Sequence, residues 1–119
     1  MKAALLLLAV AACDPVWGAK VSLRDPASRQ IEAATLAVAC PEGTQHASHT
    51  SMAAKSRRDG TAFVGSIGGQ FPVGCDLYIA KPGYRTHHIS YAELCPNGPE
   101  GCNRYFEFEL VLEPEVSVR

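Results

Sequence analysis

The stretch DGTAFVGSIGGQFPVGCDLYIAKPGY, residues 59–84, decides the fold class of this chain. It opens on an Asp-Gly turn signal, continues into a predicted strand over residues 61–66, and is then broken by glycines and a proline. The segment CDLYIAK, residues 75–81, follows with apolar residues at alternate positions and ends at a Pro-Gly turn. The pattern predicts two short strands that are separated by turns.

The flanking segments continue this pattern. The clearest is RYFEFELVLE, residues 104–113, which places Phe and Leu on one face of a strand and glutamates on the other. We interpret residues 42–58 as a long loop with one weak edge strand. Further strands are predicted around Val21 and Leu23, over residues 31–40 and over residues 84–90. Short strands separated by turns predict an all-β sandwich, Greek-key in type, with about seven strands.

Composition limits the size and the partners of the protein. The chain has 119 residues, enough for one small domain, and 11 basic against 12 acidic side chains. No basic stripe is present that could neutralise a phosphate backbone, so we expect no nucleic-acid partner.

Five cysteines divide into one near the N-terminus and an even set of four, Cys40, Cys75, Cys95 and Cys102. An even set in an exported protein indicates disulfides, and four cysteines allow three connectivities. Cys40 is on the same strand face as Leu36 and Val38, and Cys75 is on the same face as Leu77 and Ile79, so both cysteines should point inward. We therefore predict that Cys40 pairs with Cys75 and that Cys95 pairs with Cys102. The loop-entropy model assigns about 4 kcal/mol to the first bond and about 2 to 3 kcal/mol to the second. The alternative, a four-cysteine zinc site, lacks any CxxC pair.

The N-terminal stretch LLLLAVAACDP, residues 5–15, combines an apolar run, two small residues and a cysteine. The run is too short for a membrane-spanning helix, which needs about 20 residues. VAAC, residues 10–13, resembles the lipobox of bacterial lipoproteins, which implies cleavage before Cys13 and acylation of its sulfur. The alternative is an ordinary secretory signal that contains a cysteine.

These observations divide the chain into four parts. We expect a signal peptide over residues 1–12, a lipidated tether over residues 13–18, a β-sandwich domain over residues 19–114 and a tail over residues 115–119. Five extended residues span at most roughly 17 Å, so the domain would lie close to the membrane, with Trp17 either capping its core or entering the membrane interface.

The stretch of residues 59–84 also resembles a carboxypeptidase regulatory-like domain, which implies a transthyretin-like sandwich. The matching positions are turn residues and alternating core residues: Asp59, Gly60, Gly74, Leu77, Ile79, Pro82, Gly83 and Tyr84. Such motifs are specific for a fold and carry little information about function.

Candidate chemistry is sparse. His46 and His49, with Arg57 and Arg58, lie in or beside the long loop and form a candidate binding loop. Adjacent His87 and His88 on a strand must point to opposite faces, which argues against a metal site. We predict no metal, no cofactor and no catalytic residues.

The resulting hypothesis is a lipid-anchored, exported lipoprotein of the bacterial envelope, monomeric, whose sandwich is a non-enzymatic binding or structural module. The partners that we expect are the membrane, through Cys13, and an envelope protein or glycan. Two alternatives share the fold: a type VI secretion lipoprotein, and a 5-hydroxyisourate hydrolase. The hydrolases carry a histidine in the first strand and a Tyr-Arg-Gly-Ser-like tail, and this chain has neither.

Overall fold

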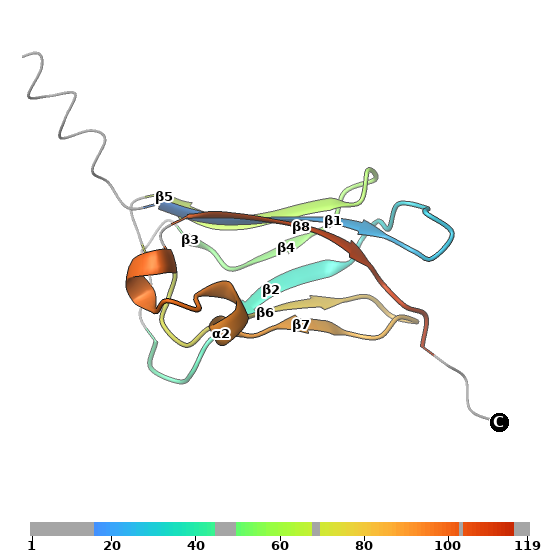
Figure 1. Ribbon diagram of the computed structural model, residues 1–119. Coiled ribbons are helices and arrows are strands. Elements are labelled where there is room, and N and C mark those ends of the chain that lie inside the picture. Colours follow the sequence, from blue (N-terminus) through green and yellow to red (C-terminus); the bar gives the residue numbers. More distant parts are fainter. Residues whose placement is uncertain (1–15, 45–49, 68–69, 103, 116–119) are drawn as a thin grey trace, which may run out of the picture.

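Two four-stranded β-sheets face each other across an apolar core, as Figure 1 shows. The computed structural model describes residues 16–44, 50–67, 70–102 and 104–115. Sheet A has the strand order β3-β5-β1-β8 and sheet B has the order β4-β2-β6-β7. The strands are β1 (Val16–Arg24), β2 (Thr35–Ala39), β3 (Thr50–Ser51), β4 (Ala53–Lys55), β5 (Thr61–Ile67), β6 (Asp76–Ala80), β7 (His87–Ile89) and β8 (Tyr105–Val111). The predicted all-β sandwich is confirmed, with eight strands in the described part of the chain where we expected about seven.

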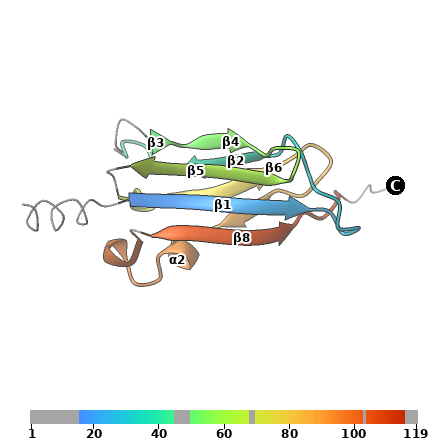
Figure 2. The same cartoon turned by 90° about the horizontal axis from the view of Figure 1, so that it is seen from above.

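Strand β1 is an interior strand of sheet A. It pairs antiparallel with β5 and parallel with β8, so the first and last strands of the sandwich lie side by side (Figure 2). Alternate residues from Trp17 to Leu23 are buried, and Trp17, at 3% exposure, belongs to the core as expected. The strand begins at Val16, earlier than the segment predicted around Val21. Gly18 does not interrupt it, because its backbone is paired on both sides.

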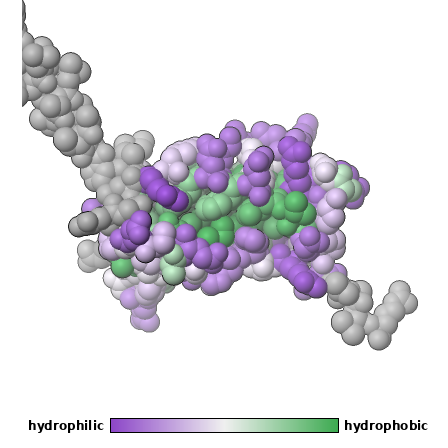
Figure 3. Space-filling view, in the orientation of Figure 1, coloured by the Kyte–Doolittle hydropathy of each residue, from purple (hydrophilic) through white to green (hydrophobic). Residues whose placement is uncertain are grey.

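The alternation predicted for the last strand is confirmed in β8. Phe106 is buried and Phe108 is half-buried on the inner face, while Glu107 and Glu109 are exposed on the outer face. Figure 3 shows the consequence as an apolar band between the hydrophilic surfaces of the two sheets.

Residues 42–58 contain two short strands rather than the single edge strand that we expected. Thr50 of β3 pairs with Ser66 in sheet A, whereas Ala54 of β4 pairs with Leu36 in sheet B. The chain therefore crosses from the edge of one sheet to the edge of the other at Met52, and the crossing divides one extended segment into two strands.

The strand predicted over residues 84–90 is longer than the observed strand β7. Tyr84 forms only an isolated bridge with Pro114, and regular pairing with β6 is confined to residues 87–89. The segment is shorter because residues 82–83 form a turn and a helix begins directly after Ser90.

That helix, α2 (Tyr91–Leu94), was not predicted. The Ser90 hydroxyl accepts a hydrogen bond from the Glu93 backbone N–H, and the Glu93 carboxylate accepts one from the Ser90 N–H. This capping box is a recognised helix start signal. A 3-10 helix, η1 (Pro99–Cys102), follows and leads the chain toward β8.

Aromatic rings fill one end of the core around Phe71, which is 1% exposed. Its ring centroid lies 5.0 Å from that of Trp17, 5.9 Å from that of Phe106 and 6.2 Å from that of Tyr91. Edge-to-face and offset contacts of this kind add to the stabilisation from apolar burial. This cluster connects β1, β8 and α2 at the end of the sandwich where β1 begins (Figure 1).

Candidate functional site

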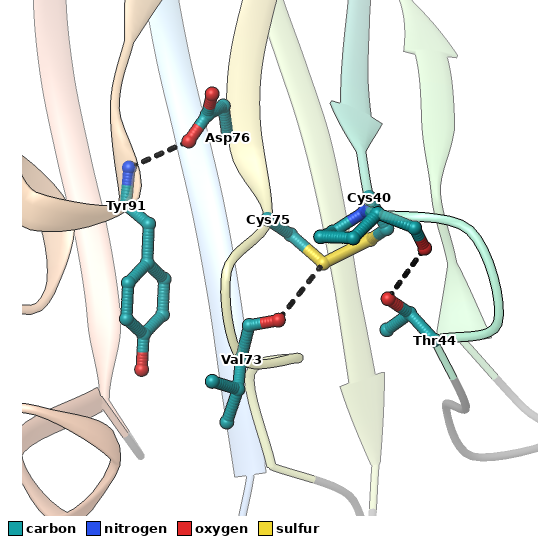
Figure 4. The surroundings of a disulfide bond; sticks show 7 residues. Cys40, Thr44, Val73, Cys75, Asp76 and Tyr91 are labelled. Atoms are coloured by element: carbon teal, nitrogen blue, oxygen red, sulfur yellow. Dashed lines mark hydrogen bonds between the residues drawn. A yellow bond between two sulfur atoms is a disulfide. The ribbon is translucent and has the colours of Figure 1, made fainter.

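The Cys40–Cys75 disulfide joins the residue after β2 to the residue before β6 (Figure 4). The two strands are antiparallel neighbours, and the two Cα atoms lie 4.2 Å apart. Beyond Cys40, the Thr44 hydroxyl donates a hydrogen bond to the Pro41 carbonyl, 2.6 Å away, which closes the following turn. The pairing predicted from strand parity is confirmed.

The second disulfide joins Cys95 to Cys102, with their Cα atoms 5.3 Å apart. It ties the end of α2 to η1 and also confirms the prediction. All four of these cysteines form disulfide bonds, which excludes the four-cysteine zinc site. Within the described ranges, no group of three or more His, Cys, Asp and Glu side chains could hold a metal ion. Two disulfides in a small domain indicate an oxidising compartment outside the cytoplasm.

Several predicted site residues lie outside the described residues. These are the lipidation site Cys13, with the signal segment before it, and the loop residues His46 and His49. In the part of the chain that is described, no helix is long and apolar enough to span a bilayer.

Arg57 and Arg58 are exposed in the turn between β4 and β5. The backbone closes this turn, since the Arg57 N–H donates to the Thr61 carbonyl at 2.8 Å and the Gly60 N–H donates to the Arg57 carbonyl at 2.9 Å. Gly60 has φ of +83°, and a Cβ there would lie 2.5 Å from the Leu23 carbonyl oxygen. The Asp-Gly turn predicted from the sequence is confirmed, and it requires glycine.

The Asp59 carboxylate is occupied inside the same turn. It accepts hydrogen bonds from the Thr61 hydroxyl at 2.6 Å and from the Thr61 backbone N–H at 3.0 Å. These bonds hold the pKa of Asp59 below its usual value, and the nearby charge of Arg57 acts in the same direction. Asp59 therefore remains ionised and orients Thr61.

Of the predicted binding loop, the structure describes Arg57 and Arg58 but not His46 and His49, so the loop as one site stays a prediction. Thr50, the first described residue after His49, pairs with Ser66 near the end of β5. Arg57 and Arg58 directly precede the opposite end of β5, at Thr61. The chain thus returns to the sandwich at the end away from the two arginines.

His87 and His88 point to opposite sides of β7, as predicted. His88 is on the outer face of sheet B, where its Nε2 lies 2.9 Å from Oδ2 of Asp76. Its ring stacks on Tyr78 with a centroid distance of 4.4 Å and an interplanar angle of 4°. Asp76 also accepts a hydrogen bond from the Tyr91 backbone N–H at 2.7 Å. The hydrogen bond from His88, and then that from Tyr91, lowers the pKa of Asp76 against the opposing effect of burial.

The outer face of sheet A, which faces the reader in Figure 2, has a different construction. Gly65, Gly18 and Tyr105 lie side by side across β5, β1 and β8. The Phe63 ring covers the space that the glycines leave, because a Cβ at Gly18 would lie 2.9 Å from Cζ of Phe63 and 3.1 Å from Cδ1 of Tyr105. The two ring centroids are 5.7 Å apart, with a tilt of 31°. The absence of side chains at Gly18 and Gly65 thus allows the Phe63 ring to lie close over the sheet, beside the Tyr105 ring.

These rings form one wall of an open cleft of about 390 Å³, lined by Lys20, Arg57, Thr61, Ala62, Phe63 and Tyr105. Phe63 is 44% exposed and Tyr105 is 56% exposed, although both carry large apolar rings. Neither cation of the cleft forms a salt bridge with any residue that the structure describes. The cleft therefore combines exposed rings, two cations that form no described salt bridge and a hydroxyl, which are groups that bind and orient a ligand.

Sequence reasoning missed most of this cleft. It identified Arg57 but placed it in a loop with the histidines. The outward parity of Phe63 and Tyr105 could have been noticed, since each alternates with buried neighbours in its own strand. Their meeting over Gly18 depends on strand register, which no local pattern shows.

Comparison with known proteins shows the fold alone. No protein-family model matches the chain, and no curated protein matches its sequence. Catechol 1,2-dioxygenase of Acinetobacter radioresistens is similar in structure, with a TM-score of 0.55 and 10% identity over 90% of this chain and 54% of the dioxygenase. The chain thus spans about half the length of that enzyme. At this identity the likeness supports a β-sandwich and says nothing about activity.

Two further solved structures are more distant. The TIE protein of Bacillus anthracis has a TM-score of 0.49 and 10% identity over 82% of this chain and 16% of its own. A pilus-presented adhesin has a TM-score of 0.31 and 12% identity over 86% of this chain and 26% of its own.

Proposed function

We propose that this protein is an exported lipoprotein, anchored to a membrane at Cys13, whose sandwich is a non-enzymatic binding module. The observation that carries the binding role is the cleft on sheet A. Its described lining residues include cations, a hydroxyl and two aromatic rings, but no histidine, cysteine or carboxylate. General acid-base and nucleophilic catalysis most often use a histidine, a cysteine or a carboxylate, and the described lining of this cleft holds none of these.

The location of the protein is supported by its disulfides and by the sequence around Cys13. Two disulfides are typical of proteins outside the cytoplasm. Because β1 begins at Val16, only Asp14 and Pro15 separate Cys13 from the sandwich. Three residue steps extend to about 11 Å at most, which is shorter than the tether that we expected. A lipid on Cys13 would therefore hold the sandwich against the headgroup region.

The finer family assignment is part of this proposal. Turns at Gly60 and Gly83, with φ of +83° and +89°, agree with the turn residues of the carboxypeptidase regulatory-like pattern. The type VI secretion alternative rests on the sandwich alone. The hydrolase alternative needs His and Arg at one site, and the cleft that holds Arg57 has no histidine among its described lining residues.

The anchor is tested by feeding cells a clickable palmitate analogue and comparing the full-length protein with its Cys13→Ser variant. We expect the wild-type protein to carry the label and to sediment with membranes, and the variant to lose both properties. An unlabelled wild-type protein in the soluble exported fraction would overturn the anchor proposal. The intact Cys40–Cys75 and Cys95–Cys102 bonds in both forms, checked by mass mapping, show that the comparison concerns the anchor alone.

The binding role is tested by cross-linking in the native envelope, followed by capture of the anchored protein. A Tyr105→Ala variant changes the cleft and leaves Cys13 in place, so it is the matched control. We expect cross-linked material that the wild-type protein retains and this variant loses. Identical material from both forms would contradict a binding role for the cleft.

A further inference from the structure

We propose that the cleft on sheet A binds an acidic sugar, that is, a pyranose ring carrying a carboxylate group. The sugar ring stacks on the Phe63–Tyr105 pair, and its carboxylate is held by Arg57 and Lys20. This inference names the ligand class of the binding role proposed above and rests on that role.

The aromatic pair is built as a platform. A pyranose has two faces of C–H groups and a rim of hydroxyls, so it needs a flat apolar surface bordered by polar groups. The Phe63 and Tyr105 rings lie close over Gly18, and Phe63 also lies over Gly65, where a Cβ would be 3.1 Å from its Cζ. The sheet fixes both rings before any ligand arrives, which lowers the entropy lost on binding. Both residues remain accessible to a partner, since Phe63 is 44% exposed and Tyr105 is 56% exposed.

The charge of the cleft selects an anionic ligand. Lys20 and Arg57 are the charged residues that line it, and neither is paired within the described part of the chain. Asp59, the carboxylate closest to Arg57 in sequence, is already engaged by both donors of Thr61. Both Thr61 bonds end at Oδ1 of Asp59, and no salt bridge joins the Arg57 guanidinium to a carboxylate that the structure describes. Arg57 can therefore offer the charge-assisted, bidentate bonds that arginine makes with carboxylates.

The size of the cleft agrees with a small carbohydrate. Its volume of about 390 Å³ is near the lower end of the range for small-molecule sites, about 300 to 1,000 Å³. The Thr61 side chain adds a polar group to the lining. An open cleft with this lining fits a sugar unit within a chain better than a ligand that must be fully enclosed.

An anionic membrane surface fits the same face less well. Side chains that enter a lipid interface project from a protein, whereas ring atoms of Phe63 and Tyr105 lie close over Gly18. The outer face of sheet A also carries Glu107 and Glu109, which line the neighbouring hollow with Lys20. A broad sheet of negative lipid charge would meet these carboxylates, but a single sugar carboxylate at Arg57 would not.

The experiment is a titration of the full-length protein, in detergent micelles, with trigalacturonic acid and with its methyl ester. The ester keeps the sugar rings and removes the negative charges. We expect chemical-shift changes at Phe63, Tyr105 and Arg57, and binding of the acid about tenfold tighter than that of the ester, as expected for one charge-assisted contact. Equal binding of both compounds, or no binding by the folded protein, would overturn the proposal.

Two variants divide the site into its parts. Tyr105→Ala removes one ring and Arg57→Gln removes one cation, and each is expected to weaken binding of the acid about tenfold. Arg57→Gln should also abolish the preference for the acid over the ester, whereas Tyr105→Ala should weaken both ligands. The matched controls are Arg24→Gln and Val111→Ala, which alter an exposed cation and an exposed apolar residue of the same sheet outside the lining. Variants that bind like the wild type would contradict the assignment.

A vesicle assay with phosphatidylglycerol separates the lipid source from the sugar. Binding to vesicles that Tyr105→Ala and Arg57→Gln abolish, together with no response to trigalacturonic acid, would show a membrane contact and refute the sugar site. Failure of this inference is distinguishable from failure of the anchor, because the sugar titration reports on the cleft whether or not Cys13 carries a lipid.

Discussion

Sheets A and B share one core, but their outer faces differ in how their polar groups are satisfied. On sheet B, Asp76 accepts bonds from His88 and Tyr91, Tyr78 stacks on His88, and a disulfide closes one end of the strand pair. On sheet A, the glycines lie under two aromatic rings, and the nearby cations have no described carboxylate partner. The outer polar side chains of sheet B thus bind one another, whereas sheet A leaves Phe63, Tyr105 and Arg57 exposed, which is the basis of the proposed binding role.

The largest effect is expected at the crosslink of sheet B. Replacing both Cys40 and Cys75 by alanine should lower the free energy of unfolding by about 4 kcal/mol, because the open chain regains loop entropy when it unfolds. Denaturant unfolding measures this loss. The matched variant that lacks Cys95 and Cys102 should lose only about 2 to 3 kcal/mol, since it opens a shorter loop. Equal losses would show that loop length does not set the contribution of these bonds.

The next effect concerns the glycine row of sheet A. A Cβ at Gly65 would lie 2.8 Å from the Trp17 carbonyl oxygen and 3.1 Å from the Gly18 Cα, and both are backbone atoms that cannot move alone. We expect Gly65→Ala to cost about 2 to 3 kcal/mol of stability through overpacking. At Gly18 the nearest atoms are ring carbons, so Gly18→Ala should cost less stability and mainly displace the rings of the cleft.

Thermal melts compare the two glycine variants, and a titration with the sugar reports on the cleft. The expected pattern is a larger loss of stability for Gly65→Ala and a clear loss of binding for Gly18→Ala. A Gly18→Ala protein with an unchanged cleft would show that the rings do not depend on the glycine beneath them.

The strands of both sheets could be predicted because alternation is a local property. The alternation also predicted that Cys40 and Cys75 point inward, and their disulfide was predicted correctly because the two strands are neighbours. Helix α2 was not predicted because four residues are too few to show a helical period. The Ser90–Glu93 capping box is the sequence signal that indicates its start. The division of residues 42–58 between two sheets follows from closure of the sandwich, which is a tertiary property.

The candidate site was predicted poorly for the same reason. Phe63 and Tyr105 lie on different strands, and only the register of both with β1 brings their rings together over Gly18. The positive charge of Arg57 and Arg58 beside the long loop led to the prediction of one cleft residue, Arg57. It did not predict how the lining residues are arranged. Local chemistry thus identified turns and core positions, while the convergence of side chains from three strands required the fold.

A smaller effect is expected at the polar cluster of sheet B. Asp76→Asn keeps the shape of the side chain but weakens its bonds to His88 and to the Tyr91 backbone, and should cost about 1 kcal/mol. Because this cluster is on the other face from the cleft, affinity for the sugar should stay unchanged. Unfolding and titration of the same preparation provide the check, and a loss of affinity would mean that the two faces are coupled.

The same cluster predicts a pH dependence. The pKa of Asp76 is lowered in the folded state from its ordinary value of 3.8. The stabilisation is therefore present above that value and is lost as the pH falls through the lower, folded-state pKa. The difference in melting temperature between the wild type and Asp76→Asn should shrink as the pH falls from 3.8 through the lower, folded-state pKa of Asp76, because the carboxylate then takes up its proton in both states. A difference that persists unchanged in acid would contradict a contribution from the carboxylate charge.

The smallest change in stability is expected at the cations of sheet A. Lys20→Gln and Arg57→Gln remove charges that have no described salt-bridge partner, so the free energy of unfolding should change by no more than about 0.5 kcal/mol. Denaturant unfolding at low and high salt measures this. If either variant were destabilised by more than about 1 kcal/mol, the cation would be part of the structure of sheet A, and the contrast with sheet B would fail. Unchanged stability combined with lost sugar affinity would instead show that the cations of sheet A serve binding and not folding. The polar groups of sheet B cannot be separated in this way, because they are already bound to one another.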